Sequence, residues 1–142
     1  MEQLIISAVT AIFNGADERN WPKVQQAMAE NVYLDYSSLS GNPAASIPAE
    51  QIINAWKSVL PGFDRTHHQL SGFAVTIEGD TATIHFNGKA DHFIDQNSWT
   101  VEGTYDATAV KENDQWHVSA LKLNLLKQSG DLSLPGEAMK RV

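Results

Sequence analysis

Two adjacent histidines, His67 and His68, are the residues of this sequence best placed to do chemistry. They open a segment that alternates like a strand, in which neighbouring side chains point to opposite faces. Leu70 is out of phase with the apolar residues further along the segment unless a β-bulge at Ser71-Gly72 restores the alternation. With the bulge, His68 faces the interior and His67 faces outward; without it, the assignment is reversed.

Alternation in two other strand-like segments turns Tyr36 and His92 toward the same interior, because each shares its face with apolar residues. His85 and His117 are interpreted as solvated surface residues. Four aromatic side chains on apolar faces are expected to contact a bound substrate: Trp56, Phe86, Trp99 and Tyr105.

Asp17 lies four residues beyond Phe13, on the apolar stripe of the first predicted helix. If that helix continues for one more turn, the carboxylate faces the core and the inward histidines. If it does not, Asp17 caps the turn that follows. The spacing alone leaves both possibilities open.

A carboxylate beside an imidazole fixes the tautomer of the ring and raises its basicity. Such a pair can remove a proton next to a carbonyl and return one to a leaving hydroxyl, and a tyrosine hydroxyl can polarise an oxygen. Asp17, Tyr36, His68 and His92 therefore suit dehydration or isomerisation without a cofactor.

Other chemistries fit the sequence less well. Two inward histidines and an aspartate could hold a metal, but no HxH or HxxxH pair supports the ligand geometry, so we expect none. There is no glycine-rich phosphate loop and no GxSxG elbow of a serine hydrolase.

Composition narrows the class of protein further. Hydrophobic residues make up 42% of the 142 residues and charged residues 19%, which is typical of a globular domain. The net charge of −7 disfavours a nucleic-acid partner. The absence of cysteine, of a basic leader and of a long apolar run favours a cytoplasmic protein that does not cross a membrane.

Helical spacing predicts helices over residues 2–14 and 21–29, and a third that opens at Pro48-Ala49-Glu50 and stops at Pro61-Gly62. Alternation predicts strands over 32–36, 67–78, 81–94, 97–111 and 115–126. We expect residues 37–47 to form a loop and the tail, residues 128–142, to be a mobile arm or a lid.

Helices followed by a long antiparallel sheet indicate an α+β fold. We expect a strongly curved, mostly antiparallel sheet wrapped around three N-terminal helices, which together form a cone-shaped barrel. Residues 1–142 then make a single domain, and the open mouth of the cone is a pocket for a small molecule.

This order of elements resembles the nuclear transport factor 2-like (SnoaL-like) superfamily, with its cystatin-like cone, and is closest in motif to the scytalone dehydratases. The resemblance covers roughly residues 10–125. Its specific pieces are Asp17-Glu18-Arg19-Asn20-Trp21, Leu34-Asp35-Tyr36-Ser37-Ser38, Pro48-Ala49-Glu50, Arg65-Thr66-His67-His68 and Ala90-Asp91-His92.

The resemblance implies a role for each of the four inward polar residues. His68 matches the general acid and base, and Asp17 matches the buried aspartate that accompanies it. Tyr36 matches a tyrosine that holds a water or polarises the substrate carbonyl, and His92 matches a histidine that hydrogen-bonds the substrate or the aspartate. The lindane dehydrochlorinases, on the same fold, are similar in pairing an aspartate with a histidine in these two elements.

The chain also departs from the dehydratases. Ala16 stands where they have a tyrosine, and their polar serine and asparagine on a later strand fall near Gly103 and Tyr105. These are positions that contact the substrate. The resemblance therefore implies a small cyclic or aromatic hydroxy-carbonyl substrate, but not scytalone itself.

Two alternatives stay open at the level of sequence. An isomerase resembling ketosteroid isomerase would use Asp35 as its base, which requires Asp35 to point inward, against the alternation. A non-catalytic module that binds a small molecule would instead have histidines that are satisfied within the core.

Outward threonines on the strand 97–111, namely Thr100, Thr104 and Thr108, suit association through the outer face of the sheet. Members of the superfamily that the chain resembles often associate in this way. We therefore predict a homo-oligomer, a dimer or a trimer. Size-exclusion chromatography with light scattering measures the mass directly, and the mass of a single chain would contradict the prediction.

Overall fold

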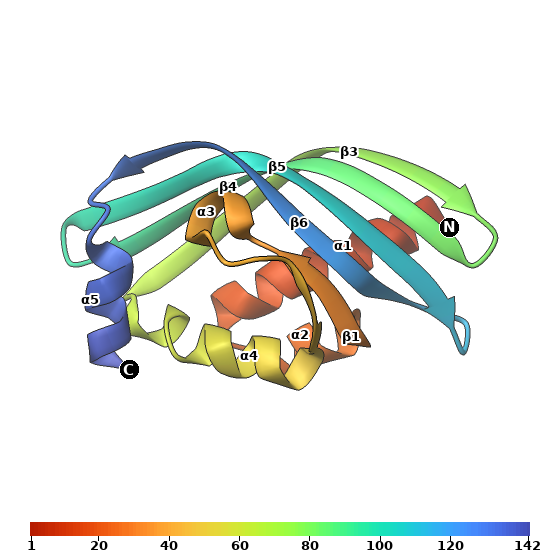
Figure 1. The fold of residues 1–142 in the computed structure, drawn as a ribbon, viewed down its shortest axis with the longest axis horizontal. Helices are drawn as coiled ribbons and strands as arrows, with labels where there is room; N and C mark the ends of the chain where they lie inside the picture. The colour runs from red at the N-terminus through yellow and green to blue at the C-terminus, as the bar shows by residue number, and fades with distance from the viewer.

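A curved six-stranded sheet arches over helices in the computed structural model, which describes residues 1–142 (Figure 1). The fold is α+β, as predicted. In chain order the elements are α1 (Glu2–Glu18), α2 (Trp21–Ala27), β1 (Met28–Asp35), α3 (Ser37–Ser40), β2 (Ala45–Pro48), α4 (Ala49–Lys57), the 3-10 turn η1 (Leu60–Gly62), β3 (Arg65–Glu78), β4 (Thr81–Ile94), β5 (Asn97–Glu112), β6 (Gln115–Gly130) and α5 (Leu134–Arg141).

The strands lie in the order β2-β1-β6-β5-β4-β3, and every neighbouring pair is antiparallel except β1 with β6. Figure 1 shows α1, α2 and α4 beneath the concave face of the sheet, with α5 at one end. Register irregularities interrupt the β3–β4 and β5–β6 pairings. Such bulges bend and twist the strands, which suits a sheet that must curve around helices.

The β-bulge expected in β3 is confirmed. Ser71 pairs with Asn87 and Ala74 with His85, so two residues of β3 oppose only one of β4. Gly72 occupies the bulge with φ +67°, a left-handed conformation that glycine adopts without steric cost. As a result His68 faces the interior and His67 is exposed.

The core fills the space between the concave face and the helices. It forms one cluster of 28 buried residues, in which Ile5, Val9, Val24 and Phe86 are fully buried. Full burial of one such aliphatic or aromatic side chain is worth about 1.5–3 kcal/mol. Packing of this kind, rather than intrinsic propensity, holds the amphipathic α1 and α2 against the sheet.

Helix α1 continues past the predicted end at residue 14. Gly15 was expected to stop it, but this glycine is buried against α2, where an added Cβ would lie 2.7 Å from Val24 Cγ2. The helix ends instead at Arg19, which adopts the left-handed conformation (φ 58°, ψ 30°). The extra turn places Asp17 on the core-facing side.

Several other boundaries differ from the predictions because tertiary pairing extends or adds elements. Residues 37–47 contain the short helix α3 and part of the edge strand β2, whereas a loop was expected. Strand β1 begins at residue 28, and β6 runs to residue 130. The tail includes α5, in which Leu134 and Ala138 are fully buried; its mobility stays a prediction. No helix combines the length and apolar character needed to span a bilayer.

Replacing Gly72 with alanine should lower the free energy of unfolding by about 1–2 kcal/mol, because an L-residue is strained at this φ. The new Cβ would also lie 2.6 Å from Asn87 Nδ2. Gly41→Ala is the matched control: with a similar φ of +79° and no atom within 4 Å, it reports the backbone strain alone and should lose less stability than Gly72→Ala. Chemical denaturation measures both variants, and a Gly72→Ala protein as stable as the wild type would contradict the role of the bulge.

Candidate active site

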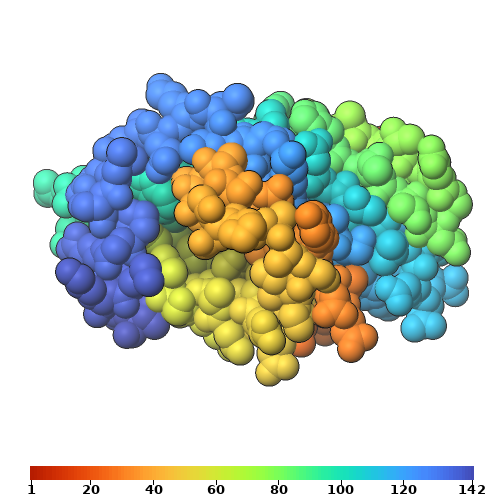
Figure 2. Space-filling view, in the orientation of Figure 1, coloured from red at the N-terminus to blue at the C-terminus, as the bar shows by residue number.

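A cavity of about 110 Å³ opens between the concave face of the sheet and the helices. Figure 2 shows the surface hollowed between α3, α4 and α5. Most of the lining is apolar, and it contains no lysine, arginine or carboxylate. The lining residues are Phe13, Ala16, Tyr36, Leu39, Trp56, Leu60, His68, Ala90, His92, Trp99, Val101, Tyr105 and Leu123.

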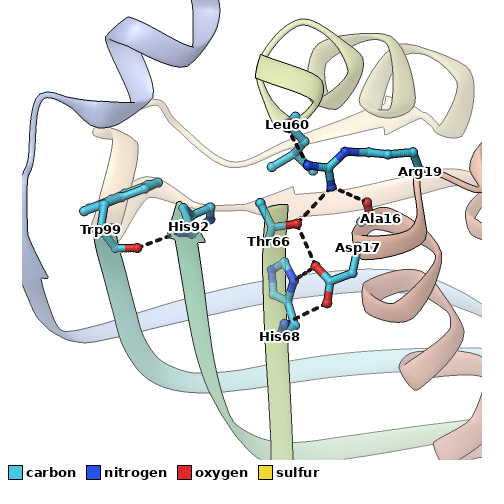
Figure 3. A network of polar contacts seen from close by, with 8 residues as sticks. All are labelled: Ala16, Asp17, Arg19, Leu60, Thr66, His68, His92 and Trp99. Atoms are coloured by element: carbon cyan, nitrogen blue, oxygen red, sulfur yellow. Dashed lines mark hydrogen bonds and ion pairs between the residues drawn. The ribbon is translucent and has the colours of Figure 1, made fainter. Parts of the chain in front are cut away.

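His68 and Asp17 form a hydrogen-bonded pair at the wall of this cavity (Figure 3). His68 Nδ1 lies 2.7 Å from Asp17 Oδ1, and the backbone N–H of His68 donates to Asp17 Oδ2 at 2.7 Å. The carboxylate accepts a hydrogen, so Nδ1 carries the proton and Nε2 is left with a free lone pair. Of the two readings of Asp17, the core-facing one is therefore correct.

Opposing influences set the pKa of Asp17. Burial alone would raise it, but hydrogen bonds from His68 and Thr66 and the proximity of His68 together lower it below the ordinary value of 3.8. The carboxyl group is therefore ionised at neutral pH. The ionised carboxylate holds the Nδ1–H of His68 and turns Nε2 away from Asp17.

Two residues of this network, Thr66 and Arg19, were not predicted. Thr66 Oγ1 donates to Asp17 Oδ1 at 2.9 Å and accepts a hydrogen bond from Arg19 Nη1 at 2.9 Å (Figure 3). Thr66 shares a face of β3 with His68 at a spacing of two, which was a usable signal. Nothing in the pattern of α1 indicated the direction of the Arg19 side chain.

His92 is a deeply buried polar group of the cavity, at 5% exposure. Its Nδ1 donates to the Trp99 carbonyl at 3.0 Å, and the ring packs between Phe63 and Trp99 at centroid distances of 5.0 and 4.3 Å. Burial lowers the pKa of His92 from 6.5 to about 4. The ring is therefore neutral at pH 7, with Nε2 as a hydrogen-bond acceptor.

Two tyrosines complete the polar part of the cavity. Tyr36 and Tyr105 pack edge to face with their ring centroids 6.5 Å apart. Burial raises the pKa of Tyr36 well above 10, and raises that of Tyr105 to about 12. Both phenols therefore keep their protons at neutral pH and can donate hydrogen bonds to an oxygen in the cavity.

Three of the four predicted substrate-contacting residues, Trp56, Trp99 and Tyr105, line the cavity. Phe86 does not, and this prediction is corrected. Its ring is fully buried and stacks behind Tyr105 at a centroid distance of 5.1 Å. Alternation predicts which face of a strand is inward, but it does not tell a core position from one that reaches an open cavity.

Asp35 lies outside the cavity, as the alternation predicted. Its Oδ1 accepts hydrogen bonds from the backbone N–H and the hydroxyl of Ser37, at 3.0 and 2.6 Å. The isomerase alternative therefore has no base at this position. His85 is exposed and pairs with Asp106 at 2.7 Å, as expected of a surface histidine; His117 is half-buried, with Nδ1 3.0 Å from the Gln26 carbonyl.

No group of three histidine, aspartate or glutamate side chains is arranged to hold a metal. Asp17 Oδ1 already accepts from Thr66 and His68, and His92 Nδ1 is held by the Trp99 carbonyl. The arrangement is suited to moving protons between a fixed carboxylate–imidazole pair and a ligand in the cavity.

The family profile of the SnoaL-like domain matches residues 2–122. The chain belongs to the SnoaL-like family. The profile spans most of the SnoaL-like core seen in the structure, from α1 into β6, and ends before α5. No curated protein matches the chain in sequence.

Solved structures share this SnoaL-like fold. The Kfla4162 protein of Kribbella flavida is 27% identical, with a TM-score of 0.87 over 96% of this chain and 95% of that one. A proposed scytalone dehydratase of Novosphingobium aromaticivorans is 16% identical, with a TM-score of 0.77 over 92% and 87%. A hexachlorocyclohexane dehydrochlorinase of Novosphingobium barchaimii is 10% identical, with a TM-score of 0.72 over 89% of each chain.

The buried, neutral His92 should make the stability of this SnoaL-like domain depend on pH. Between pH 6.5 and about 4 the unfolded chain binds a proton at this residue that the folded chain does not. The free energy of unfolding should therefore fall by about 3 kcal/mol as the pH falls through this range. Chemical denaturation at a series of pH values should show a flatter profile for His92→Gln than for the wild type.

His67→Gln is the matched control, because His67 is exposed and pairs with no carboxylate, and it should keep the pH dependence of the wild type. Parallel profiles for His92→Gln and the wild type would show that His92 is not held neutral.

Proposed function

We propose that this protein is a cofactor-independent acid–base lyase of the dehydratase type, acting on a small cyclic or aromatic hydroxy-carbonyl compound. The observation that carries the proposal is the Asp17–His68 pair, joined at 2.7 Å in the wall of an open cavity. The pair leaves His68 Nε2 free to exchange a proton with a ligand.

The reaction needs one base, one acid and one electrophile. His68 Nε2 removes the proton from the carbon next to the substrate carbonyl, while Asp17 stabilises the imidazolium that forms. The electron pair of the broken C–H bond forms a C=C bond as the neighbouring C–O bond breaks. His68 returns its proton to the departing hydroxide, which leaves as water.

The tyrosine and the second histidine supply the remaining interactions. Tyr36 keeps its phenolic proton because burial raises its pKa, and it donates a hydrogen bond to the carbonyl oxygen as negative charge develops there. His92 is a neutral acceptor, since burial lowers its pKa to about 4, and it holds a hydroxyl of the substrate. In this role His92 binds and orients the substrate, and His68 alone changes its protonation state.

The lining of the cavity supports the proposed substrate class. Trp56, Trp99 and Tyr105 offer flat apolar surfaces that suit a ring. No cationic side chain lines the cavity, so a carboxylate or phosphate on the ligand would be desolvated without a partner. Among proteins of this fold, one is named as a proposed scytalone dehydratase and others as dehydrochlorinases; both names denote eliminations.

Replacing His68 with alanine should lower kcat by about 10²–10⁴-fold, because the general base is removed. The assay follows the ultraviolet absorbance of the conjugated product over a panel of hydroxy-ketones and hydroxylated aromatic ketones. His67→Ala is the matched control, since the neighbouring ring is exposed and faces away from the cavity. Equal turnover by His68→Ala and the wild type would overturn the proposal.

A second candidate function is a module that binds the same class of compound without turnover, which the mostly apolar cavity also suits. The same panel separates the two functions. Saturable binding by calorimetry with no product from the wild type on any compound would favour the binding module.

A further inference from the structure

We propose that Arg19 is a positioning residue that acts through Thr66. By donating to the Thr66 hydroxyl, Arg19 orients that hydroxyl so that it donates a hydrogen bond to Asp17. This hydrogen bond holds the Asp17–His68 pair in the geometry needed for proton transfer. This inference rests on the proposed function for its catalytic consequence. The clamp of Arg19 and Thr66 itself is a property of the structure that can be tested without a substrate.

The first support is the placement of Arg19. The residue ends α1 in a left-handed conformation, with φ 58°, where glycine is the usual choice. An arginine there costs backbone energy, and such outliers persist only where the surrounding structure holds them. The side chain does not line the cavity, so it is not a direct contact for a ligand.

The second support is the set of atoms that Arg19 contacts. Its guanidinium is half-buried and has no carboxylate within ion-pair distance, and all of its partners are neutral oxygens. Nη1 donates to the Ala16 carbonyl at 2.8 Å and to Thr66 Oγ1 at 2.9 Å, and Nη2 donates to the Leu60 carbonyl at 2.7 Å (Figure 3). One planar fork thus joins α1, β3 and η1 around the pair.

The third support is that a hydroxyl group has only one proton to donate. Thr66 has a single O–H proton, and the Arg19 N–H groups can only donate. Because Arg19 donates to Thr66 Oγ1, the hydroxyl proton must point elsewhere, and Asp17 Oδ1 lies 2.9 Å away. Hydrogen bonds in such a chain polarise one another, so the donor to Asp17 is both aimed and strengthened.

The consequence reaches His68 through Asp17. Oδ1 accepts from Thr66 and from His68 Nδ1, and Oδ2 accepts from the His68 backbone N–H. With these donors fixed, the carboxylate has one orientation, and that orientation sets the plane of the imidazole. Proton transfer is sensitive to displacements of about 1 Å, which can cost about 10²-fold in rate.

The first experiment measures the pKa of Asp17 by the ¹³C resonance of its carboxyl group, with no substrate present. The groups that face Asp17 are Arg19 on its own helix, His68 on β3 and His92 on β4. Thr66→Val removes a donor that helps to lower the pKa of Asp17, so the pKa should rise toward 3.8. Arg19→Met frees the Thr66 hydroxyl to turn away from Asp17, so it should move the pKa in the same direction. Because His92 titrates near pH 4, each variant is repeated in a His92→Gln background.

Conservative and matched variants identify the cause. Thr66→Ser keeps the hydroxyl but loses the methyl group, and it should keep the low pKa of Asp17. If packing of Thr66 were the cause, Thr66→Ser would raise this pKa as Thr66→Val does. Arg65→Met and Thr76→Val are the controls, since both residues are exposed on β3. Neither substitution should change the pKa of Asp17. An unchanged Asp17 pKa in both Thr66→Val and Arg19→Met would overturn the clamp.

The second experiment measures kinetics on any compound that the wild type converts. Arg19→Met and Thr66→Val should each lower kcat about tenfold with KM within about twofold, because neither side chain lines the cavity. Since Arg19 acts through Thr66, the double variant should be no slower than the slower single variant. Multiplying losses in the double variant would overturn the proposal.

Two further outcomes are decisive. Should Arg19→Met fail to fold, Arg19→Lys keeps the charge but lacks the fork that joins three acceptors, and an unchanged kcat in that variant would overturn the proposal. Should the wild type turn over no compound, the proposed function fails, while the Asp17 titrations still decide for or against the clamp.

Discussion

A carboxylate that is withdrawn from water must find hydrogen-bond donors or take up a proton, and the structure around Asp17 meets this constraint. Its donors come from two residues of β3, His68 through its backbone and ring and Thr66 through its hydroxyl. The requirement ties the end of α1 to the start of β3. Core packing holds both elements in the fold, and the charged group fixes how their ends meet.

The pleat of the sheet brings these residues and side chains from neighbouring strands to the same cavity. Thr66 and His68 face inward together because they are two residues apart, and the bulge at Gly72 keeps them in phase with the apolar residues of the same strand. Strands β4 and β5 then bring His92 and Tyr105 to the same space. Helices beneath the sheet fill most of the concave face and leave a cavity lined by these side chains.

Much of this was predictable because it depends on periodicity. The order of the main helices and strands, the inward face of His68 and the cone-shaped fold follow from alternation, a glycine at the bulge and a recognisable set of motifs. Phe86 was misassigned because an inward phase does not distinguish core from cavity. Arg19 was missed because the direction of its side chain depends on a left-handed residue at the end of α1, which no periodic pattern signals.

The segment between residues 37 and 47 and the tail were also beyond the reach of local patterns. Both gain their structure from distant partners: β2 pairs with β1, and Ser38 bonds the backbone of β6 through Leu123 and Leu125. Helix α5 buries Leu134 and Ala138 against the rest of the fold. The composition of a segment does not predict pairings with distant residues, because these form only when the sheet assembles.

Helix α5 differs from the rest of the fold in its relation to the family pattern. The helix lies beyond residue 122, where the shared family pattern ends, and it packs near η1, whose Leu60 forms part of the cavity wall. The Asp17–His68 pair, by contrast, lies wholly inside that pattern. Helix α5 contributes no residue to the cavity wall, so a substitution there reaches the cavity through neighbours such as η1, far along the sequence from the Asp17–His68 pair.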